Sequence, residues 1–223
     1  MRYAALACDY DGTLACDGIV GERTIEALRR LKERSVLLVL VTGRTLEELL
    51  AIFPEISLFE RVVAENGAVL YRPGTRDYRI LASPPTEKFI ELLKQRGVHP
   101  LSVGHVIVAT HQPQQTNVLE AIHELGTEMQ VIFNKGAVMI LPSGVNKASG
   151  LGAALEEMQV QPGQVVAIGD AENDHALLEF CGVAAAVANA IPALKERAAW
   201  VAGSANGQGV IELIEEFITK NFW

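Results

Sequence analysis

The sequence has few of the features that mark secreted or membrane-spanning proteins. It contains only three cysteines among 223 residues, Cys8, Cys16 and Cys181. Their spacing matches no metal-binding motif and their number is odd, so we expect free thiols in a reducing compartment. No apolar run approaches the roughly 18 residues that span a bilayer. The first apolar run is short and interrupted by acids, unlike a signal peptide, and we expect a soluble cytoplasmic protein.

Basic clusters are also missing. Lysine and arginine number 19 against 27 aspartates and glutamates, which gives a formal net charge of −8. Nucleic-acid backbones and anionic membranes both attract basic surfaces, yet no Lys/Arg cluster here is longer than a dipeptide. We therefore expect no nucleic-acid partner and no membrane partner. The Walker A pattern GxxxxGK[ST] is absent too, and no HExxH spacing connects the histidines. The oligomeric state stays open.

Short apolar runs that alternate with helical patterns dominate the rest of the chain. With 49% hydrophobic residues the chain can bury a sizeable core. The runs are apolar throughout instead of alternating, as in strands buried on both faces of a parallel sheet. We expect strands at 3–8, 36–41, 61–65, 164–169, 182–188 and 200–203. The predicted fold is therefore α/β, with a Rossmann-like parallel sheet as its core.

The middle of the chain has a different pattern. Residues 79–143 contain two helical segments closed by Gly97 and Gly126, one strand, and two further strands joined by a short turn containing glycine. This order predicts a small α+β cap inserted into the core. The core would then consist of residues 1–78 and 144–223.

Two aspartates follow the first predicted strand. Asp9 and Asp11 belong to the stretch CDYDGT. Side chains alternate along a strand, so both carboxylates should lie on one face, about 6 to 7 Å apart at their backbones. Like charges at that separation repel one another unless a cation or a proton relieves them. A hard cation such as Mg²⁺ fits, because it prefers oxygen ligands.

Polar residues also follow other strands. In VTGR, Thr42 and the Gly43 N–H could bind an anion at a helix start, although an ordinary N-cap would explain them as well. Asp170, Asn173 and Asp174 in GDAEND suit either a metal or a helix cap.

Lys147 starts another helix, where a cation is best explained by a facing anion, although lone lysines are more often solvated. In an open parallel sheet, ligands bind beyond the carboxyl ends of the strands. A pocket there would combine carboxylates for a metal with donors for an anion, which suits phosphoryl transfer.

These motifs make the chain resemble the haloacid dehalogenase superfamily, in the Cof-like phosphatase branch whose cap follows the second motif. The four family motifs occur in order across the chain: DYDGT (9–13), VTGR (41–44), NK (146–147) and GDAEND (169–174). The small cap makes it similar to archaeal phosphoglycolate phosphatases and to sugar-phosphate phosphatases related to sucrose-phosphatase. The resemblance implies a magnesium-dependent phosphatase of a small phosphorylated metabolite, of sugar-phosphate or phosphoglycolate type.

The resemblance also implies separate roles for the two aspartates. Asp9 would be the nucleophile that forms an aspartyl-phosphate, and Asp11 would protonate the leaving alkoxide and then deprotonate water. Asp at position 11 favours phosphate-ester chemistry, because dehalogenases lack this acid and P-type ATPases carry threonine there.

Two ligand sets follow from the same resemblance. Mg²⁺ would be held by Asp9, by the backbone carbonyl of Asp11 and by Asp170. Asp174 would orient the site. The transferring phosphoryl group would be bound by Thr42, Gly43, Lys147 and Asn173.

Three residues have two readings each. Asn66-Gly67 is typical of a hairpin turn, and in the family this loop faces the cleft, where Asn66 would contact the leaving group. Arg44 either forms an ion pair or contacts substrate. Asn189 either caps the helix beginning near Ile191, which we favour, or supports the acidic loop.

The alternatives to a phosphatase are a phosphomutase similar to phosphomannomutases and a non-catalytic binding or regulatory protein. A mutase would return the phosphoryl group to a sugar instead of water. The presence of Asp9, Asp11 and Lys147 argues against the non-catalytic alternative.

Overall fold

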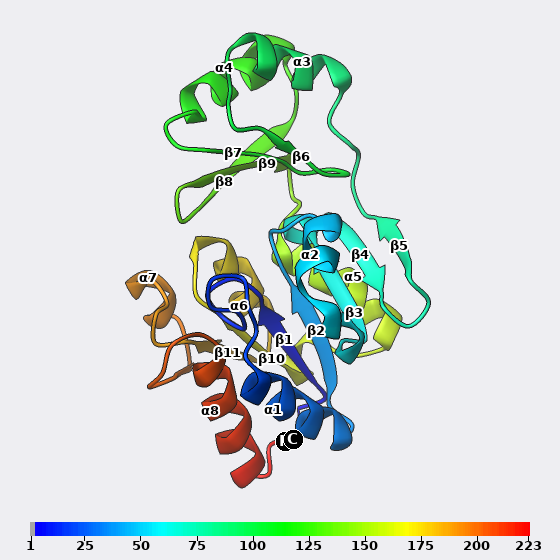
Figure 1. Ribbon diagram of the computed structural model, residues 1–223, viewed down its shortest axis with the longest axis vertical. Coiled ribbons are helices and arrows are strands. Elements are labelled where there is room, and N and C mark those ends of the chain that lie inside the picture. Colours follow the sequence, from blue (N-terminus) through cyan, green and yellow to red (C-terminus); the bar gives the residue numbers. More distant parts are fainter. Residues whose placement is uncertain (1–2) are drawn as a thin grey trace.

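The computed structural model describes residues 3–223 as a core built on one eight-stranded sheet, with a four-stranded sheet above it (Figure 1). The core sheet has the order β12-β11-β10-β1-β2-β3-β4-β5. Its strands are β1 Ala5–Asp9, β2 Leu37–Val41, β3 Arg61–Ala64, β4 Val69–Arg72, β5 Asp77–Ile80, β10 Val165–Gly169, β11 Val183–Ala186 and β12 Trp200–Val201. The α/β prediction is confirmed.

The central strands are parallel because helices connect them across the faces of the sheet. From β12 to β3 all neighbours are parallel, whereas β3, β4 and β5 form an antiparallel meander. Every residue of β1 is buried, as its continuous apolar sequence predicts for a strand covered on both faces. The helices are α1 Glu22–Glu33, α2 Leu46–Ile52, α3 Glu87–Gln95, α4 Gln115–Leu125, α5 Lys147–Met158, α6 His175–Phe180, α7 Pro192–Lys195 and α8 Asn206–Thr219.

Helices cover both faces of the core sheet. Helices α1 and α8 contact one another, and α5 and α6 contact one another (Figure 1). The inner stripe of α1 is apolar at Ile25, Leu28 and Leu31, the spacing of one helix face. None of the helices within residues 3–223 has both the length and the apolar character needed to cross a membrane.

Strand register brings the predicted site residues to one edge of the core sheet. Cys8 of β1 is paired with Ile168 of β10, and Asp9 is paired with Val41 of β2. The residues that follow these strands therefore leave the sheet at the same level, on the side that faces the second sheet.

The second sheet belongs to the segment inserted between β5 and α5. Its strands have the order β6-β7-β9-β8, all antiparallel: β6 Ser102–Val103, β7 Val108–His111, β8 Met129–Asn134 and β9 Ala137–Pro142. Figure 1 shows this sheet facing the core, with α3 and α4 on its far side. Phe89 and Val118 from the two helices are buried against it. Gly126 ends α4 with a φ of 59°, the left-handed conformation that favours glycine.

The expected start of the cap at residue 79 falls inside β5. This strand is hydrogen-bonded to β4 and so belongs to the core sheet. We therefore propose that the cap begins after β5, while its expected end at 143 lies just beyond β9. β5 was not predicted, because its residues are exposed and lack an apolar run. β6 was not predicted either, because that strand has only two residues.

Candidate active site

Three strand ends and one helix start form the floor of the site. β1 ends at Asp9, β2 is followed by Thr42, β10 is followed by Asp170, and α5 begins at Lys147. These elements are far apart in the sequence, and the parallel sheet brings their ends together.

Lys147 lies beneath the floor and is almost inaccessible to water. Its Nζ donates to Asp9 Oδ1 at 2.5 Å and to Asp174 Oδ1 at 2.6 Å. Burial alone would lower the pKa of this lysine, but the carboxylates of Asp174 and Asp9 outweigh burial and raise the pKa above its ordinary value. The side chain is therefore a buried cation that faces two carboxylates, in agreement with the expectation that it faces an anion.

Three buried carboxylates form a cluster here, and two of them, Asp9 and Asp174, are bonded to this cation. Single oxygens of Asp9, Asp170 and Asp174 all lie within 4.8 Å of one another. Burial raises the pKa of Asp9 to about 8, with Asp174 and Asp170 adding to the rise and Lys147 opposing it. Burial also raises the pKa of Asp170. A cluster of oxygen ligands from three acids suits a hard divalent cation.

Asp174 also shapes the loop that carries Asp170. Its Oδ2 accepts hydrogen bonds from the backbone N–H groups of Asp170 at 2.8 Å and Ala171 at 3.0 Å. Thr13 Oγ1 donates to Asp170 Oδ1 at 3.3 Å. The carboxylate of Asp174 is thus engaged from both sides, by Lys147 and by the loop backbone.

Asp11 lies apart from these three carboxylates. The strand ends at Asp9, so the alternation that predicted one shared face stops applying before Asp11. Its carboxylate instead pairs with Arg44, which donates from Nε to Oδ2 at 2.6 Å and from Nη2 to Oδ1 at 2.7 Å. Arg44 thus forms an ion pair, one of its two predicted roles, and this bond raises its pKa.

The phosphate-binding candidates from other loops lie close together. Asn173 Nδ2 donates to Asn66 Oδ1 at 3.0 Å, which joins the acidic loop to the turn after β3. A Cβ at Gly43 would lie 2.8 Å from Met139 Cε, so the end of this cap side chain lies close to the backbone of the loop. Thr42 is buried, and its Oγ1 accepts from the N–H of Arg44 at 3.1 Å.

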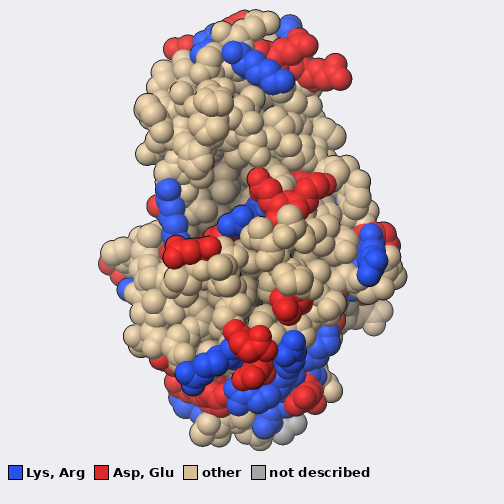
Figure 2. Space-filling model, viewed as in Figure 1, with Lys and Arg blue, Asp and Glu red and all other residues tan. Residues whose placement is uncertain are grey.

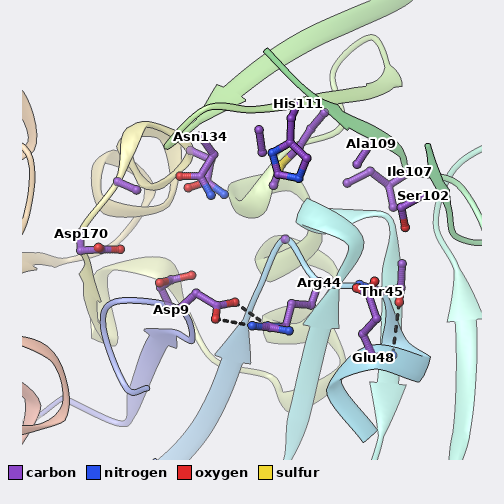
Figure 3. A pocket seen from close by; sticks show the side chains of 16 residues that line it. Asp9, Arg44, Thr45, Glu48, Ser102, Ile107, Ala109, His111, Asn134 and Asp170 are labelled. Carbon is purple, nitrogen blue, oxygen red and sulfur yellow. Dashed lines mark hydrogen bonds and ion pairs between the residues drawn. The ribbon is translucent and has the colours of Figure 1, made fainter. Parts of the chain in front are cut away.

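A cavity of about 410 Å³ separates this floor from the cap. Figure 3 shows Asp9, Arg44 and Asp170 on the core side. The cap side is formed by Ser102, Ile107, Ala109, His111, Asn134, Ala137 and Met139. Figure 2 shows a hollow at this boundary, where acidic and basic side chains meet below a mostly uncharged cap surface.

Comparison with known proteins decides the family. The family model of haloacid dehalogenase-like hydrolases matches residues 6–125 and 101–214. The chain belongs to this family. The predicted membership of the haloacid dehalogenase superfamily is confirmed, and so is the prediction that the protein is a phosphatase.

Two curated relatives of this hydrolase span nearly the whole chain. One is the phosphoglycolate phosphatase of Methanothermobacter thermautotrophicus, 34% identical over 225 residues, which covers 96% of this chain and 98% of the relative. Another is phosphoglycolate phosphatase 2 of Saccharolobus solfataricus, 30% identical, which covers 97% of this chain and 93% of the relative.

Solved structures of similar fold include a haloacid dehalogenase-like hydrolase from Bacteroides thetaiotaomicron. It has a TM-score of 0.80 at 20% identity, and the match covers 97% of this chain and all of that one. A haloacid dehalogenase-like hydrolase from B. subtilis has a TM-score of 0.79 at 15% identity, with 95% and 99% covered. At these identities the likeness concerns the fold.

The residues predicted for this hydrolase's site divide into two groups by position. Those that line the cavity are Asp9, Asp11, Gly43, Arg44, Asp170 and Asn173. Those buried beneath or beside it are Thr42, Asn66, Lys147 and Asp174. Asn66 has a φ of 54° in the turn between β3 and β4, consistent with the predicted Asn-Gly hairpin.

Lys135 also belongs to the site, although no sequence pattern predicts it. It lies in the turn between β8 and β9, and its Nζ forms an ion pair with Asp170 Oδ2 of the core. Its backbone N–H also points to Glu172 Oε2 at 3.4 Å. The stretch NKG predicted only a turn, because nothing local shows that this turn reaches the core.

The prediction that Asn189 caps the helix near Ile191 is wrong. Asn189 does not cap α7, whose N-cap residue is Ile191. Its Nδ2 instead donates to the backbone carbonyl of Gly12 at 2.8 Å and to Asp170 Oδ2 at 3.4 Å. The alternative reading, support of the acidic loop, describes these contacts.

Proposed function

We propose that this hydrolase is a magnesium-dependent phosphatase that cleaves a small phosphorylated metabolite through an aspartyl-phosphate on Asp9. The observation that carries the proposal is the Asp9 carboxylate at the cavity floor, with one oxygen held 2.5 Å from Lys147 Nζ. Covalent catalysis needs a nucleophile fixed in an orientation that points at the reacting atom. Lys147 supplies that orientation and neutralises charge where the phosphoryl group would enter.

The proposed reaction consists of two displacements at phosphorus. In the first, a carboxylate oxygen of Asp9 bonds to phosphorus while the ester P–O bond breaks, and protonated Asp11 gives its proton to the leaving oxygen. In the second, Asp11 takes a proton from a water whose oxygen bonds to phosphorus, which releases inorganic phosphate and restores Asp9. Arg44 holds Asp11 by two hydrogen bonds at the cavity wall.

The residues present fit a magnesium ion. Asp9, Asp170 and Asp174 offer only oxygen atoms. Burial raises the pKa of Asp9 and Asp170, and a cation bound there would favour their ionised forms. Asp9 and Asp170 would hold the ion, together with the carbonyl of Asp11, while Asp174 orients the loop. When bound, the ion supplies positive charge that lets an anionic phosphate ester approach a carboxylate.

The remaining donors would bind the transferring phosphoryl oxygens. Gly43 and Asn173 line the cavity, and the Lys147 ammonium is bonded to Asp9 beneath the floor. Charge develops on these oxygens during transfer, and fixed donors stabilise it without reorganisation. Thr42 would complete this set from beneath the floor.

We propose 2-phosphoglycolate as the first substrate to test, with sugar phosphates next. The two archaeal relatives that span this chain are both named phosphoglycolate phosphatases. The cavity, about 410 Å³, lies in the size range of pockets for small metabolites.

Phosphate release with and without Mg²⁺ tests the proposal. The full chain is assayed on 2-phosphoglycolate and p-nitrophenyl phosphate, alongside Asp9→Asn and the matched control Asp17→Asn. Asp17 is exposed on the same segment, and its φ of 51° is one that asparagine tolerates. We expect Asp9→Asn to lose about a thousandfold or more in kcat, and Asp17→Asn to keep its activity.

Equal activity of Asp9→Asn and the parent would sink the assignment. Turnover without any bisphosphate activator would separate a phosphatase from a phosphomutase. Trapping the acyl-phosphate with hydroxylamine and locating the modified residue by mass spectrometry would test the intermediate, which must map to Asp9.

A further inference from the structure

Glu65 is a fully buried acid that the mechanism above does not use. It follows β3 in the core, with a φ of 51°, a left-handed conformation that non-glycine residues seldom adopt. Its carboxylate accepts three backbone hydrogen bonds from the cap: from His105 at 2.9 Å, Val106 at 2.7 Å and Ile107 at 2.9 Å. One core side chain therefore binds three consecutive N–H groups of the turn between β6 and β7.

This turn is shaped to receive the carboxylate. A Cβ at Gly104 would lie 2.6 Å from Glu65 Oε1, so only glycine leaves room for the acid. Consecutive N–H groups that converge on one anion form a concave binding site. Charge-assisted hydrogen bonds of this kind are stronger than neutral ones, and without them a buried carboxylate would be costly.

The backbone at Glu65 and Asn66 in the core holds the loop of residues 42–44, which is proposed above to bind phosphate and is called here the phosphate-binding loop. The Glu65 N–H donates to the carbonyl of Arg44 at 2.9 Å, and the Asn66 N–H donates to the carbonyl of Thr42 at 2.9 Å. Asn66 also joins the acidic loop through Asn173. A single dipeptide thus contacts the cap through its side chain and the cavity floor through its backbone.

The cap turn that Glu65 holds also forms part of the roof. Ile107 lines the cavity and packs with Val106, Met139 and Ala68 in a small apolar cluster between core and cap. Met139 in turn lies over Gly43 of the floor. The Glu65 contact therefore ties this part of the roof to the core.

We propose that Glu65 is a positioning residue that holds the cap over the phosphate-binding loop, so that the roof contacts the leaving group of the substrate. This role rests on the proposed phosphatase function. Glu65 does not touch the reacting atoms in this role. It acts through Ile107 and Met139, which a substrate larger than inorganic phosphate would meet.

Two variants disturb this contact from opposite sides. Glu65→Gln removes the charge and turns an amide NH₂ toward backbone donors, while Gly104→Ala places a Cβ against the same carboxylate. Glu91→Gln, on the exposed side of α3, makes the same chemical change as the first variant and serves as control. The two variants alter different partners of one contact. The double variant should therefore change hydrogen exchange and KM by less than the sum of the two single effects.

Hydrogen exchange measures the contact directly, in the full chain without substrate. We expect the N–H groups of residues 105–107 to exchange at least about tenfold faster in both variants, and unchanged in Glu91→Gln. In the activity assay, KM for the hydrolysed ester should rise about tenfold. The inhibition constant of inorganic phosphate, which meets only the floor, should stay within about twofold.

Unchanged exchange in both variants would overturn the proposal. So would an equal rise in KM and in the phosphate inhibition constant, because it would mean that Glu65 shapes the floor and not the cap. If the parent hydrolyses no phosphate ester, the proposed function fails. The exchange comparison still decides whether Glu65 holds the cap.

Discussion

The Lys147 ammonium lies 2.5 Å from the Asp9 carboxylate, although 138 positions separate the two residues in the sequence. The side chains are only 1% and 6% exposed. A buried pair of this kind is expensive to form, since both charges leave water. The pair lies at the cavity that Asp9 lines, where the proposed reaction would use its charge.

Removing Lys147 should harm both stability and activity. In Lys147→Met the carboxylates of Asp9 and Asp174 lose their buried partner, which typically costs about 3 to 5 kcal/mol. Urea unfolding monitored by circular dichroism gives this loss, and phosphate release gives the loss of activity. Adding Asp9→Asn should recover part of the stability, because it removes one unpaired charge. A single variant as stable as the parent would contradict the prediction.

The metal-free protein should become less stable as the pH rises toward 8. Burial raises the pKa of Asp9 from 3.8 to about 8. Between these values the folded protein keeps a proton that the unfolded chain has lost, so the free energy of unfolding falls as pH rises and levels off above about 8. In EDTA, the stability of Asp9→Asn relative to the parent should therefore increase with pH. Excess Mg²⁺ should reduce this dependence, and a constant difference would refute the assignment.

Arg44→Lys should impair the chemistry more than it impairs folding. Lysine keeps the charge but cannot donate to both oxygens of Asp11, as the guanidinium does at 2.6 and 2.7 Å. We expect kcat to fall about tenfold or more, with little change in melting temperature because the pair is partly exposed. Arg23→Lys on the exposed surface of α1 is the control.

Lys135→Met should bind Mg²⁺ more tightly than the parent. The Lys135 ammonium pairs with Asp170 Oδ2, an oxygen that the proposed ion would also use. Because this lysine is 46% exposed, the gain should be modest, about threefold in dissociation constant. Titration calorimetry without substrate measures it, with the exposed Lys88→Met of α3 as control. Weaker binding would show that Lys135 assists the ion instead of competing with it.

Local patterns predicted the elements that are buried or capped. The apolar runs before Asp9 and Asp170 are strands because both faces of the sheet are covered, and burial of a continuous run is what such a sheet requires. β5 could not be predicted in this way, because its four residues are exposed and show no burial pattern. The shared face predicted for Asp9 and Asp11 was wrong, because β1 ends at Asp9 and strand alternation does not extend to Asp11.

Contacts between distant segments could not be predicted in this way. The pairing of Glu65 with residues 105–107 and of Lys135 with Asp170 joins core and cap across 35 to 42 positions. Neither pair has a local signature, since a glutamate beside Asn-Gly and a lysine in a turn are ordinary surface features. Only the docking of the cap on the core decides which of these charges becomes buried.

By itself, the sequence determined the buried parallel strands, the positions of Asp9, Thr42 and Asp170 at or just after strand ends, and the family motifs, because these depend on local hydrophobicity and spacing. The tertiary structure decided how the charges are paired. Lys147 lies between Asp9 and Asp174, Arg44 holds Asp11, and Glu65 binds the cap. Pairing depends on distance and burial in three dimensions, because electrostatic energy varies with separation and solvent exposure and not with position along the chain.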